Sequence, residues 1–268
     1  MNPDVSHARR LRLWIPLLAF ALAACGSSPS VDDKASAEAL HAEARADMAS
    51  GNYERAIKSL ERVEGRGAGT LLAQQAALDL AYAYWKSGER AQALSALDRF
   101  IKLHPSSPAL DYALYLKGLI NFNENLGFMS SVSRQDMTER DQQASRDAHQ
   151  AFKQLTEQFP DSRYSPDARA RMDYIVNALA RYELHVARYY YRRGAFIAAA
   201  NRAQQAVNDY QRTPSVEEAL YILARSYERL GLNDLRDDAD RVLKKNFPDS
   251  RFPSEGISRG DDAWWKFW

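Results

Sequence analysis

Apolar residues recur through the middle of the chain at intervals of three and four, with polar and charged residues between them. In one stretch Ala56 and Ile57 are followed by Leu60 and Val63. Later stretches repeat this spacing: Ala93, Leu94, Leu97 and Phe100, then Ala148, Phe152 and Leu155. Such spacing places apolar side chains on one face of a helix. Because alanine and leucine are also abundant and β-branched residues sparse, the predicted fold class is all-α.

The helical stretches are punctuated by glycine and proline at a regular interval. Gly51 and Gly88 lie 37 residues apart, and so do Gly194 and Gly231. Three second helices are expected to end at a proline: Pro105, Pro160 and Pro248. The line 159–164 (FPDSRY) returns almost unchanged as 247–252 (FPDSRF). Self-similarity at this period indicates stacked helix pairs, none of which buries its apolar face alone.

The detailed pattern resembles the tetratricopeptide repeat, in which small residues stand where two helices cross. First helices carry Ala81, Gly118, Ala187 and Ala224, and second helices carry Ala56, Ala93, Ala148 and Ala199. In the last repeat Arg236 replaces the expected small residue. The resemblance predicts a right-handed α-solenoid of five tetratricopeptide-like helix pairs over residues 36–252. The expected repeats are 37–70, 74–107, 111–162, 166–213 and 217–250.

Two irregularities interrupt the period. The third repeat is about 18 residues too long, and the excess falls at 123–142. This insertion is expected to form an extended loop, either as solvated filler or as a partner contact. Between Pro166 and Arg193 there is no other proline or glycine. We therefore expect one helix of about 27 residues there, which projects beyond its neighbours or bridges two halves of the solenoid.

The N-terminus has the layout of a bacterial lipoprotein signal. A basic segment precedes an uncharged apolar run, which ends in Leu22-Ala23-Ala24-Cys25. This run is too short for a mature membrane span. Residues 1–24 are therefore predicted to be a cleaved signal peptide and Cys25 the site of lipid attachment, followed by a flexible tether at 25–35. The alternative is an ordinary signal with an incidental cysteine. By resemblance to sorted lipoproteins, Gly26 after the cysteine favours the outer membrane, with the protein facing the periplasm.

Composition excludes several classes of function. Removal of the signal takes three Arg and one Asp from 36 basic and 35 acidic residues, so the rest is nearly neutral and gives no support for nucleic-acid binding. The sequence carries none of the hydrolase, metalloprotease or paired-cysteine motifs, and its histidines lack metal-ligand spacing. The glycine-rich run 65–69 is interpreted as a connection between repeats. We expect no enzyme, no cofactor and no metal.

Aromatic residues gather on the first helices, which line the concave face of such solenoids. Most are expected to pack between repeats, and the rest to form a groove for extended peptides. Tyr84, Tyr112 and Tyr115 are the candidates for this groove. The segment 253–268 ends in Trp264, Trp265, Phe267 and Trp268. This aromatic tail is predicted to act as a cap on the last repeat, a membrane contact or a partner contact.

The sequence resembles the BamD (ComL) family of the β-barrel assembly machinery over residues 22–252. The matching lines are Leu80–Tyr84, Leu97–Pro105, Asp111–Leu119, Ala187–Tyr190 and Arg193–Arg202. The resemblance implies a non-enzymatic scaffold that helps to fold and insert outer-membrane β-barrels. Its C-terminal repeats would bind a POTRA domain of BamA, and its N-terminal repeats would receive unfolded outer-membrane proteins. Other BAM lipoproteins would join the complex.

Within the Arg193–Arg202 line, the resemblance marks Arg202 as the arginine placed against BamA, and Arg193 as a second partner-binding residue. An arginine can bind a carboxylate across an interface with two hydrogen bonds. An intramolecular salt bridge on the solenoid is the alternative for Arg202. For the whole protein, the alternative function is a periplasmic tetratricopeptide adaptor linked to cell division or envelope integrity. A peptidoglycan-active enzyme is disfavoured, because the sequence has no acid/base or nucleophile constellation.

Overall fold

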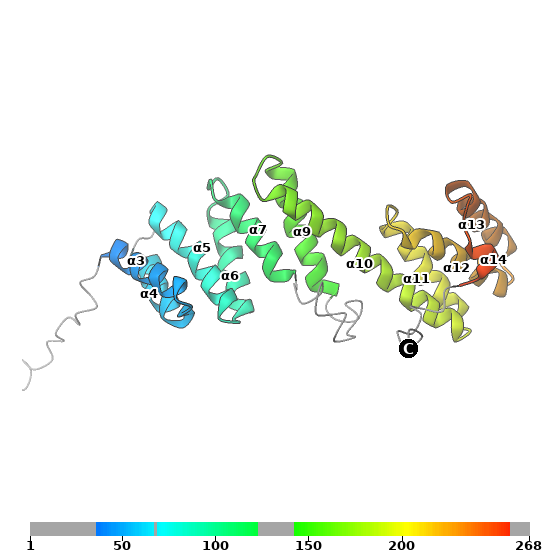
Figure 1. The fold of residues 1–268 in the computed structure, drawn as a ribbon, viewed down its shortest axis with the longest axis horizontal. Coiled ribbons are helices and arrows are strands. Elements are labelled where there is room, and N and C mark those ends of the chain that lie inside the picture. The colour runs from blue at the N-terminus through cyan, green and yellow to red at the C-terminus, as the bar shows by residue number, and fades with distance from the viewer. Residues whose placement is uncertain (1–35, 67–68, 123–141, 258–268) are drawn as a thin grey trace, which may run out of the picture. The chain divides into compact units, whose positions relative to one another are not determined.

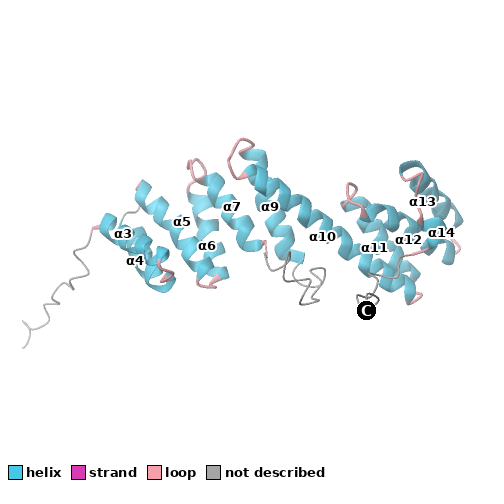
Figure 2. Cartoon of the chain, viewed as in Figure 1, coloured by secondary structure: helices cyan, strands magenta, loops and turns pink. Residues whose placement is uncertain are grey.

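The computed structural model describes residues 36–66, 69–122 and 142–257 (Figure 1). Helices, turns and loops account for all of these residues, and none of them forms a strand (Figure 2). The chain divides into two compact units, Met1–Ala76 and Ala77–Trp268, which we describe separately. Several predicted segments lie outside the described residues: the predicted signal peptide 1–24, Cys25 with the predicted tether 25–35, insertion residues 123–141 and tail residues 258–268.

The first unit contains one helix pair and the start of the next helix. It comprises α3 (Ala37–Ala49), α4 (Tyr53–Arg66) and the first turns of α5 (Leu71–Lys86). The side chain of Ser36 caps α3 by accepting a hydrogen bond from the backbone N–H of Ala39. The ion pair of Asp47 and Arg55, 2.6 Å long, joins the two helices. The expected connection at 65–69 is wrong at its start, because α4 continues through Gly65 and Arg66.

The second unit continues the series of helices from the rest of α5 to a short terminal helix. Its members are α6 (Arg90–Leu103), α7 (Leu110–Asn121), α9 (Gln142–Gln158), α10 (Ser165–Arg192), α11 (Phe196–Asp209), α12 (Ser215–Arg229), α13 (Asn233–Asn246) and α14 (Phe252–Glu255). Each helix from α6 to α13 packs against the next, and α10 also packs against α12. The fold is thus all-α and built from helix pairs. The long helix is confirmed, since α10 has 28 residues.

The helix ends follow the punctuation of the sequence. Gly88, Gly194 and Gly231 have φ values of 89°, 76° and 74°. After α10, the N–H of Gly194 donates to the carbonyl of Tyr191, and the N–H of Ala195 to that of Tyr190. This Schellman pattern ends a helix at a left-handed residue, which glycine adopts without steric cost. α6, α9 and α13 each end two residues before a proline.

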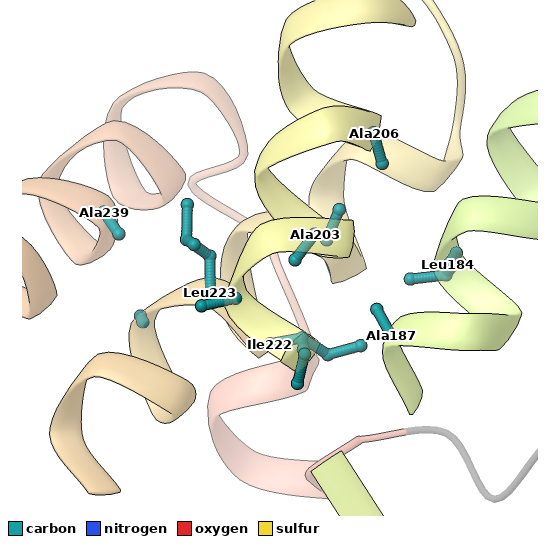
Figure 3. Close-up of a cluster of buried hydrophobic side chains, with 11 residues drawn as sticks. Leu184, Ala187, Ala203, Ala206, Ile222, Leu223 and Ala239 are labelled. Atoms are coloured by element: carbon teal, nitrogen blue, oxygen red, sulfur yellow. The ribbon is translucent and has the colours of Figure 1, made fainter. Parts of the chain in front are cut away.

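Small residues fill the helix crossings, as the repeat pattern predicted. Ala81, Ala187 and Ala224 of the first helices are fully buried, and so are Ala93, Ala148 and Ala199 of the second helices. At Gly118 even a methyl group has no room, because a Cβ there would lie 2.3 Å from Cε1 of Phe152. Figure 3 shows one resulting core cluster, with Leu184 and Ala187 of α10, Ala203 and Ala206 of α11, Ile222 and Leu223 of α12, and Ala239 of α13.

The last helix pair departs from this crossing pattern. Arg236 stands where the other second helices have alanine, and it pairs with Asp237 at 2.8 Å instead of entering the crossing. One turn later Asp240 accepts a hydrogen bond of 2.6 Å from Arg225 of α12. The crossing of α12 and α13 is therefore partly polar, and apolar packing there relies on Ala239 and Leu243.

The repeated line FPDSR(Y/F) makes the same turn twice. In both copies the N–H of the serine donates to the carbonyl of the phenylalanine, Ser162 to Phe159 and Ser250 to Phe247. The aromatic ring that follows then stacks on the first helix of its own repeat. Tyr164 stacks on Tyr115 with ring centroids 4.7 Å apart, and Phe252 on Tyr221 at 6.0 Å. The first copy leads into α10 and the second into α14, so α14 stands where a further first helix would begin.

Candidate partner-binding surfaces

Aromatic side chains from α7 and the start of α10 form one cluster. Its members are Tyr112, Tyr115 and Tyr164, with Phe152 of α9 behind them. Tyr112 lies 5.7 Å from Tyr164, centroid to centroid, and all three tyrosines are partly exposed. We call Tyr112, Tyr115 and Tyr164 the aromatic cluster. Rings held in place by their neighbours offer broad contact area at low entropic cost, which suits recognition of a peptide.

Charged groups fix the orientation of this cluster. The hydroxyl of Tyr115 donates to Asp167 at 2.7 Å, and Arg171 donates to the same carboxylate at 2.6 Å. The guanidinium of Arg163 lies over the Tyr164 ring, 4.7 Å from its centroid, and donates to its hydroxyl. These contacts join α7 to α10 and hold the rings in one arrangement, so a ligand binding there would have little ordering to impose.

The surroundings of Tyr112 and Tyr115 raise the pKa of both hydroxyls. Burial raises the pKa of Tyr112 to about 12, with a further contribution from Asp79. Burial and the hydrogen bond to Asp167 raise the pKa of Tyr115 to about 12. Burial raises the pKa of Asp167, but the hydrogen bonds from Arg171 and Tyr115 outweigh it, and the net shift is downward. Tyr112 and Tyr115 therefore keep their protons to more alkaline pH than a free tyrosine, beside the ionised carboxylate of Asp167.

The third groove candidate, Tyr84, lies in a neighbouring cluster. Tyr84 of α5 packs against buried residues of α5, α6 and α7 together with Tyr82, Trp85 and Tyr112. Tyr82 and Trp85 meet edge to face at 6.0 Å. Tyr112 belongs to both clusters, so all three predicted tyrosines lie in adjoining clusters. Tyr84 contributes to the packing of the neighbouring cluster only.

Arg202 of α11 is engaged within the chain. Its Nη1 donates to Oε2 of Glu183 on α10 at 3.0 Å. Glu183 is only 1% exposed, whereas the Arg202 side chain is 38% exposed. A buried carboxylate needs a charged or hydrogen-bonding partner. The intramolecular salt bridge that sequence analysis left open as the alternative is therefore present, and the Arg202 side chain remains partly exposed.

Arg193 has a different environment. It is the C-cap residue that follows α10, it is exposed, and its guanidinium lies 5.5 Å from the centroid of the Tyr189 ring. Tyr189 is itself 47% exposed. A cation over an exposed ring leaves the charge accessible, so Arg193 and Tyr189 form a surface that a carboxylate-bearing partner can contact.

Sequence reasoning missed three residues that complete the aromatic cluster: Tyr164, Asp167 and Arg171. The repeated FPDSR(Y/F) line was visible in the sequence, but its role as a ring-stacking turn was not. Glu183 was also missed, because the spacing of 19 residues to Arg202 carries no local pattern. These contacts join separate helices, and only the packing of α10 against α7 and α11 brings the residues together.

The described part of the chain was also searched for metal-binding groups and for helices that could span a membrane. Within 36–66, 69–122 and 142–257, no group of three or more acidic, histidine or cysteine side chains is arranged to hold a metal ion. Among the helices of these ranges, none combines the length and the apolar character that crossing a bilayer requires.

Comparison with known proteins identifies a family. A family model described as an outer membrane lipoprotein (YfiO) matches residues 33–243. A protein of Neisseria meningitidis serogroup A, named outer membrane protein assembly factor BamD, is 47% identical over 257 residues, covering 94% of this chain and 96% of its own. Proteins of the same name from Neisseria gonorrhoeae and Pasteurella multocida are 46% and 35% identical, covering 94% and 87% of this chain and 96% and 89% of theirs.

Among solved structures, the MamA protein matches 83% of this chain and 96% of its own, at 15% identity and a TM-score of 0.34. A putative kinesin light chain from Podosopora anserina with nearly identical tetratricopeptide-like repeats matches at the same TM-score and 16% identity, covering 80% of this chain and 97% of its own. A TM-score of this size adds nothing to the fold described above.

Proposed function

Because the chain belongs to the BamD family of outer membrane lipoproteins, we propose that it is the BamA-binding scaffold of the β-barrel assembly machinery and a receptor for unfolded outer-membrane proteins. Family membership makes it a non-enzymatic assembly factor associated with the outer membrane. The preformed aromatic cluster, held by Asp167 and Arg163, is the observation that best supports the receptor role. No observation favours the adaptor of cell division.

The aromatic cluster is the proposed substrate site. An unfolded β-barrel protein offers extended segments with aromatic residues, and stacked rings bind such segments without needing a fixed backbone geometry. Tyr112 and Tyr115 would contact the substrate directly. Tyr84 would act through the packing that holds Tyr112 in place, since both lie against one buried cluster.

The end of α10 is the proposed BamA surface. Arg193 and Tyr189 present a charge and a ring to solvent, and Arg202 lies on the adjoining helix with its side chain partly exposed. A BamA carboxylate would meet Arg193 without disturbing the core. Contact with Arg202 would be shared with Glu183, so this arginine positions α10 against α11 as well as facing the partner.

The membrane attachment proposed is a lipid on Cys25, with the helix pairs facing the periplasm. Several acyl chains on one residue anchor a protein stably, at about 0.8 kcal/mol for each buried CH₂. Cys25→Ser should abolish labelling by radioactive palmitate and release the protein from the membrane. Unchanged labelling would exclude Cys25 as the attachment site.

Co-purification from native membranes tests the BamA surface. With the lipidated full chain as bait, Arg193→Glu should reduce recovered BamA several-fold, since it reverses an exposed charge. Lys153→Glu is the matched control, because it reverses an exposed charge on α9 in a weak surface pair with Glu157. Equal recovery with both variants would remove Arg193 from the interface, and absence of BamA from the wild-type eluate would contradict the whole assignment.

Photocrosslinking tests the substrate site. A photoreactive residue in place of Tyr112 should crosslink to an unfolded outer-membrane protein, because the aromatic cluster lies around it. The same residue in place of Lys244 on α13 should crosslink far less, since that exposed position is on another repeat. Crosslinks of equal strength at both positions would show that the contact is not specific to the cluster.

A further inference from the structure

Basic residues share one face of the second half of α10. Arg181, His185, Arg188 and Arg192 follow one another at intervals of four, three and four residues. Residues at these intervals lie one above another on a helix surface. Asn177, one turn before Arg181 on the same face, is uncharged. We call these four residues the basic row, and it contains no acidic member.

The carboxylates of two glutamates lie near the basic row, and both are buried and paired. Glu183 of α10 is 1% exposed and accepts a hydrogen bond from Arg202. Glu218 of α12 accepts one of 2.7 Å from Arg188, and its side chain is 5% exposed. The other three members of the row are exposed. This half of α10 therefore presents positive charge to solvent, although the whole chain is nearly neutral.

The basic row lies on the side of α10 that is next to α12. The hydrogen bond between Arg188 and Glu218 sets this position, and the two helices pack directly against each other. The Arg188 side chain is only 18% exposed, so the middle of the row is recessed relative to its ends. A flat bilayer contacts protruding side chains first, whereas an extended polypeptide can follow a recessed line between two helices.

The length and chemistry of the row suit an acidic polypeptide. The 11 residues from Arg181 to Arg192 span about 16 Å of helix, at about 1.5 Å each. An extended chain covers that length in about five residues, at about 3.3 Å each. A guanidinium can bind a carboxylate with two parallel hydrogen bonds, and complementary charge selects the partner.

We propose that the basic row binds an extended acidic segment of a partner protein, with carboxylates about five residues apart that contact Arg181 and Arg192. The row precedes the proposed BamA surface along α10, since that surface begins at Tyr189 and centres on Arg193. The inference goes beyond the function proposed above and does not depend on it, because it rests on the charge and the placement of α10 alone.

A synthetic peptide tests the proposal. The probe is a fluorescein-labelled chain of glycine and serine with two pairs of glutamates five residues apart. It is titrated with the purified mature protein in a neutral detergent. Arg181→Glu combined with Arg192→Glu should weaken binding several-fold. Lys244→Glu combined with Lys245→Glu is the matched control, because it makes the same change in net charge at two exposed positions of α13, and it should have little effect.

Nuclear magnetic resonance locates the bound peptide without a charge reversal. The imidazole resonances of His185 should move on addition of the peptide, and loss of the signal in His185→Gln assigns them. The resonances of His149 on α9 should not move, since that residue lies outside the row. A peptide with glutamine in place of every glutamate should leave His185 unchanged.

Three results would overturn the proposal. The first is no binding of the peptide, or binding that leaves the His185 resonances in place. The second is equal weakening by the α10 and α13 variants, which would mean that only net charge matters. The third is binding of phosphatidylglycerol vesicles through Arg181 and Arg192 when the peptide does not bind, which would make the row a lipid contact. If the double variant of α10 fails to fold, Arg181→Glu against Lys244→Glu gives the same comparison.

Discussion

At Gly118 the repeat requires a residue smaller than alanine. The other first helices have alanine at this place, but here the facing residue is Phe152, whose ring occupies the space of a methyl group. In the neighbouring pairs the facing second-helix position holds Leu60, Leu97 and Ala203, which are smaller. The small residue Gly118 on α7 and the large residue Phe152 on α9 therefore fill the α7–α9 crossing together.

Gly118→Ala is expected to destabilise the chain by about 1–3 kcal/mol, because the new methyl must displace a buried ring. Phe152→Leu in the same chain should recover part of this loss. Gly65→Ala is the control, since a Cβ there meets nothing within 4 Å, and it should be neutral or slightly stabilising. Chemical denaturation measures all three. A neutral Gly118→Ala would show that the crossing has free space.

Arg202→Met is expected to destabilise the chain by about 2 kcal/mol, because it leaves the buried carboxylate of Glu183 without its cation. Adding Glu183→Gln should restore most of the stability, since the amide has no charge to compensate. Arg193→Met serves as control and should leave the denaturation midpoint unchanged. If Arg202→Met alone leaves the midpoint unchanged, Glu183 has another partner and Arg202 is available to bind BamA.

Alkaline titration probes the aromatic cluster. In the folded chain the pKa of Tyr115 is raised from 10 to about 12. Between these values the unfolded chain has released a proton that the folded chain still holds, so the contribution to stability is present below pH 10 and is lost as pH rises toward 12. Tyr115→Phe should flatten this decline, measured by thermal melting across the range. An unchanged decline would assign it to other tyrosines.

At the level of helices, sequence reasoning succeeded where the signal is local. The glycine turns, the helix ends before proline and the length of α10 follow from single residues and their spacing. It failed where partners lie on different helices. The pairing of Glu183 with Arg202 and the stacking of Tyr164 on Tyr115 depend on how helices pack, and no periodicity encodes them. α14 was missed because four residues give no periodic pattern.

Gly194→Ala should cost about 1 kcal/mol, because the residue after α10 has a φ of 76°, where a Cβ is strained. Gly194→Asn should cost less, since asparagine tolerates the left-handed region. Thermal melting compares the two. A Cβ at Gly194 would meet nothing within 4 Å, so crowding is not expected to contribute. Equal losses for the two variants would contradict the argument from backbone strain.

For the whole molecule, the second unit behaves as a series of neighbours. Each helix pair contacts mainly the pairs beside it, and the buried clusters follow one another along the chain. In such an array, stability is the sum of local terms and nearest-neighbour interfaces. A substitution that destabilises one helix pair is therefore expected to have little effect on the stability of distant pairs.

Leu155→Ala removes a fully buried side chain of α9 and should cost about 2–5 kcal/mol. Amide hydrogen exchange should quicken in α7, α9 and the first half of α10, and change little in α12 and α13. Uniform quickening across the unit would show that it unfolds as one cooperative body.

The one-turn helix α14 also marks a junction for protein engineering. Phe252 already makes the stacking contact that Tyr164 makes at the start of α10, so the array ends on a correctly oriented first turn. Replacing Gly256 with alanine and splicing a further copy of the α12–α13 pair after that position would let the α14 turn continue as a helix. Such a splice would lengthen the array at α14 while leaving the residues of the pairs before it unchanged.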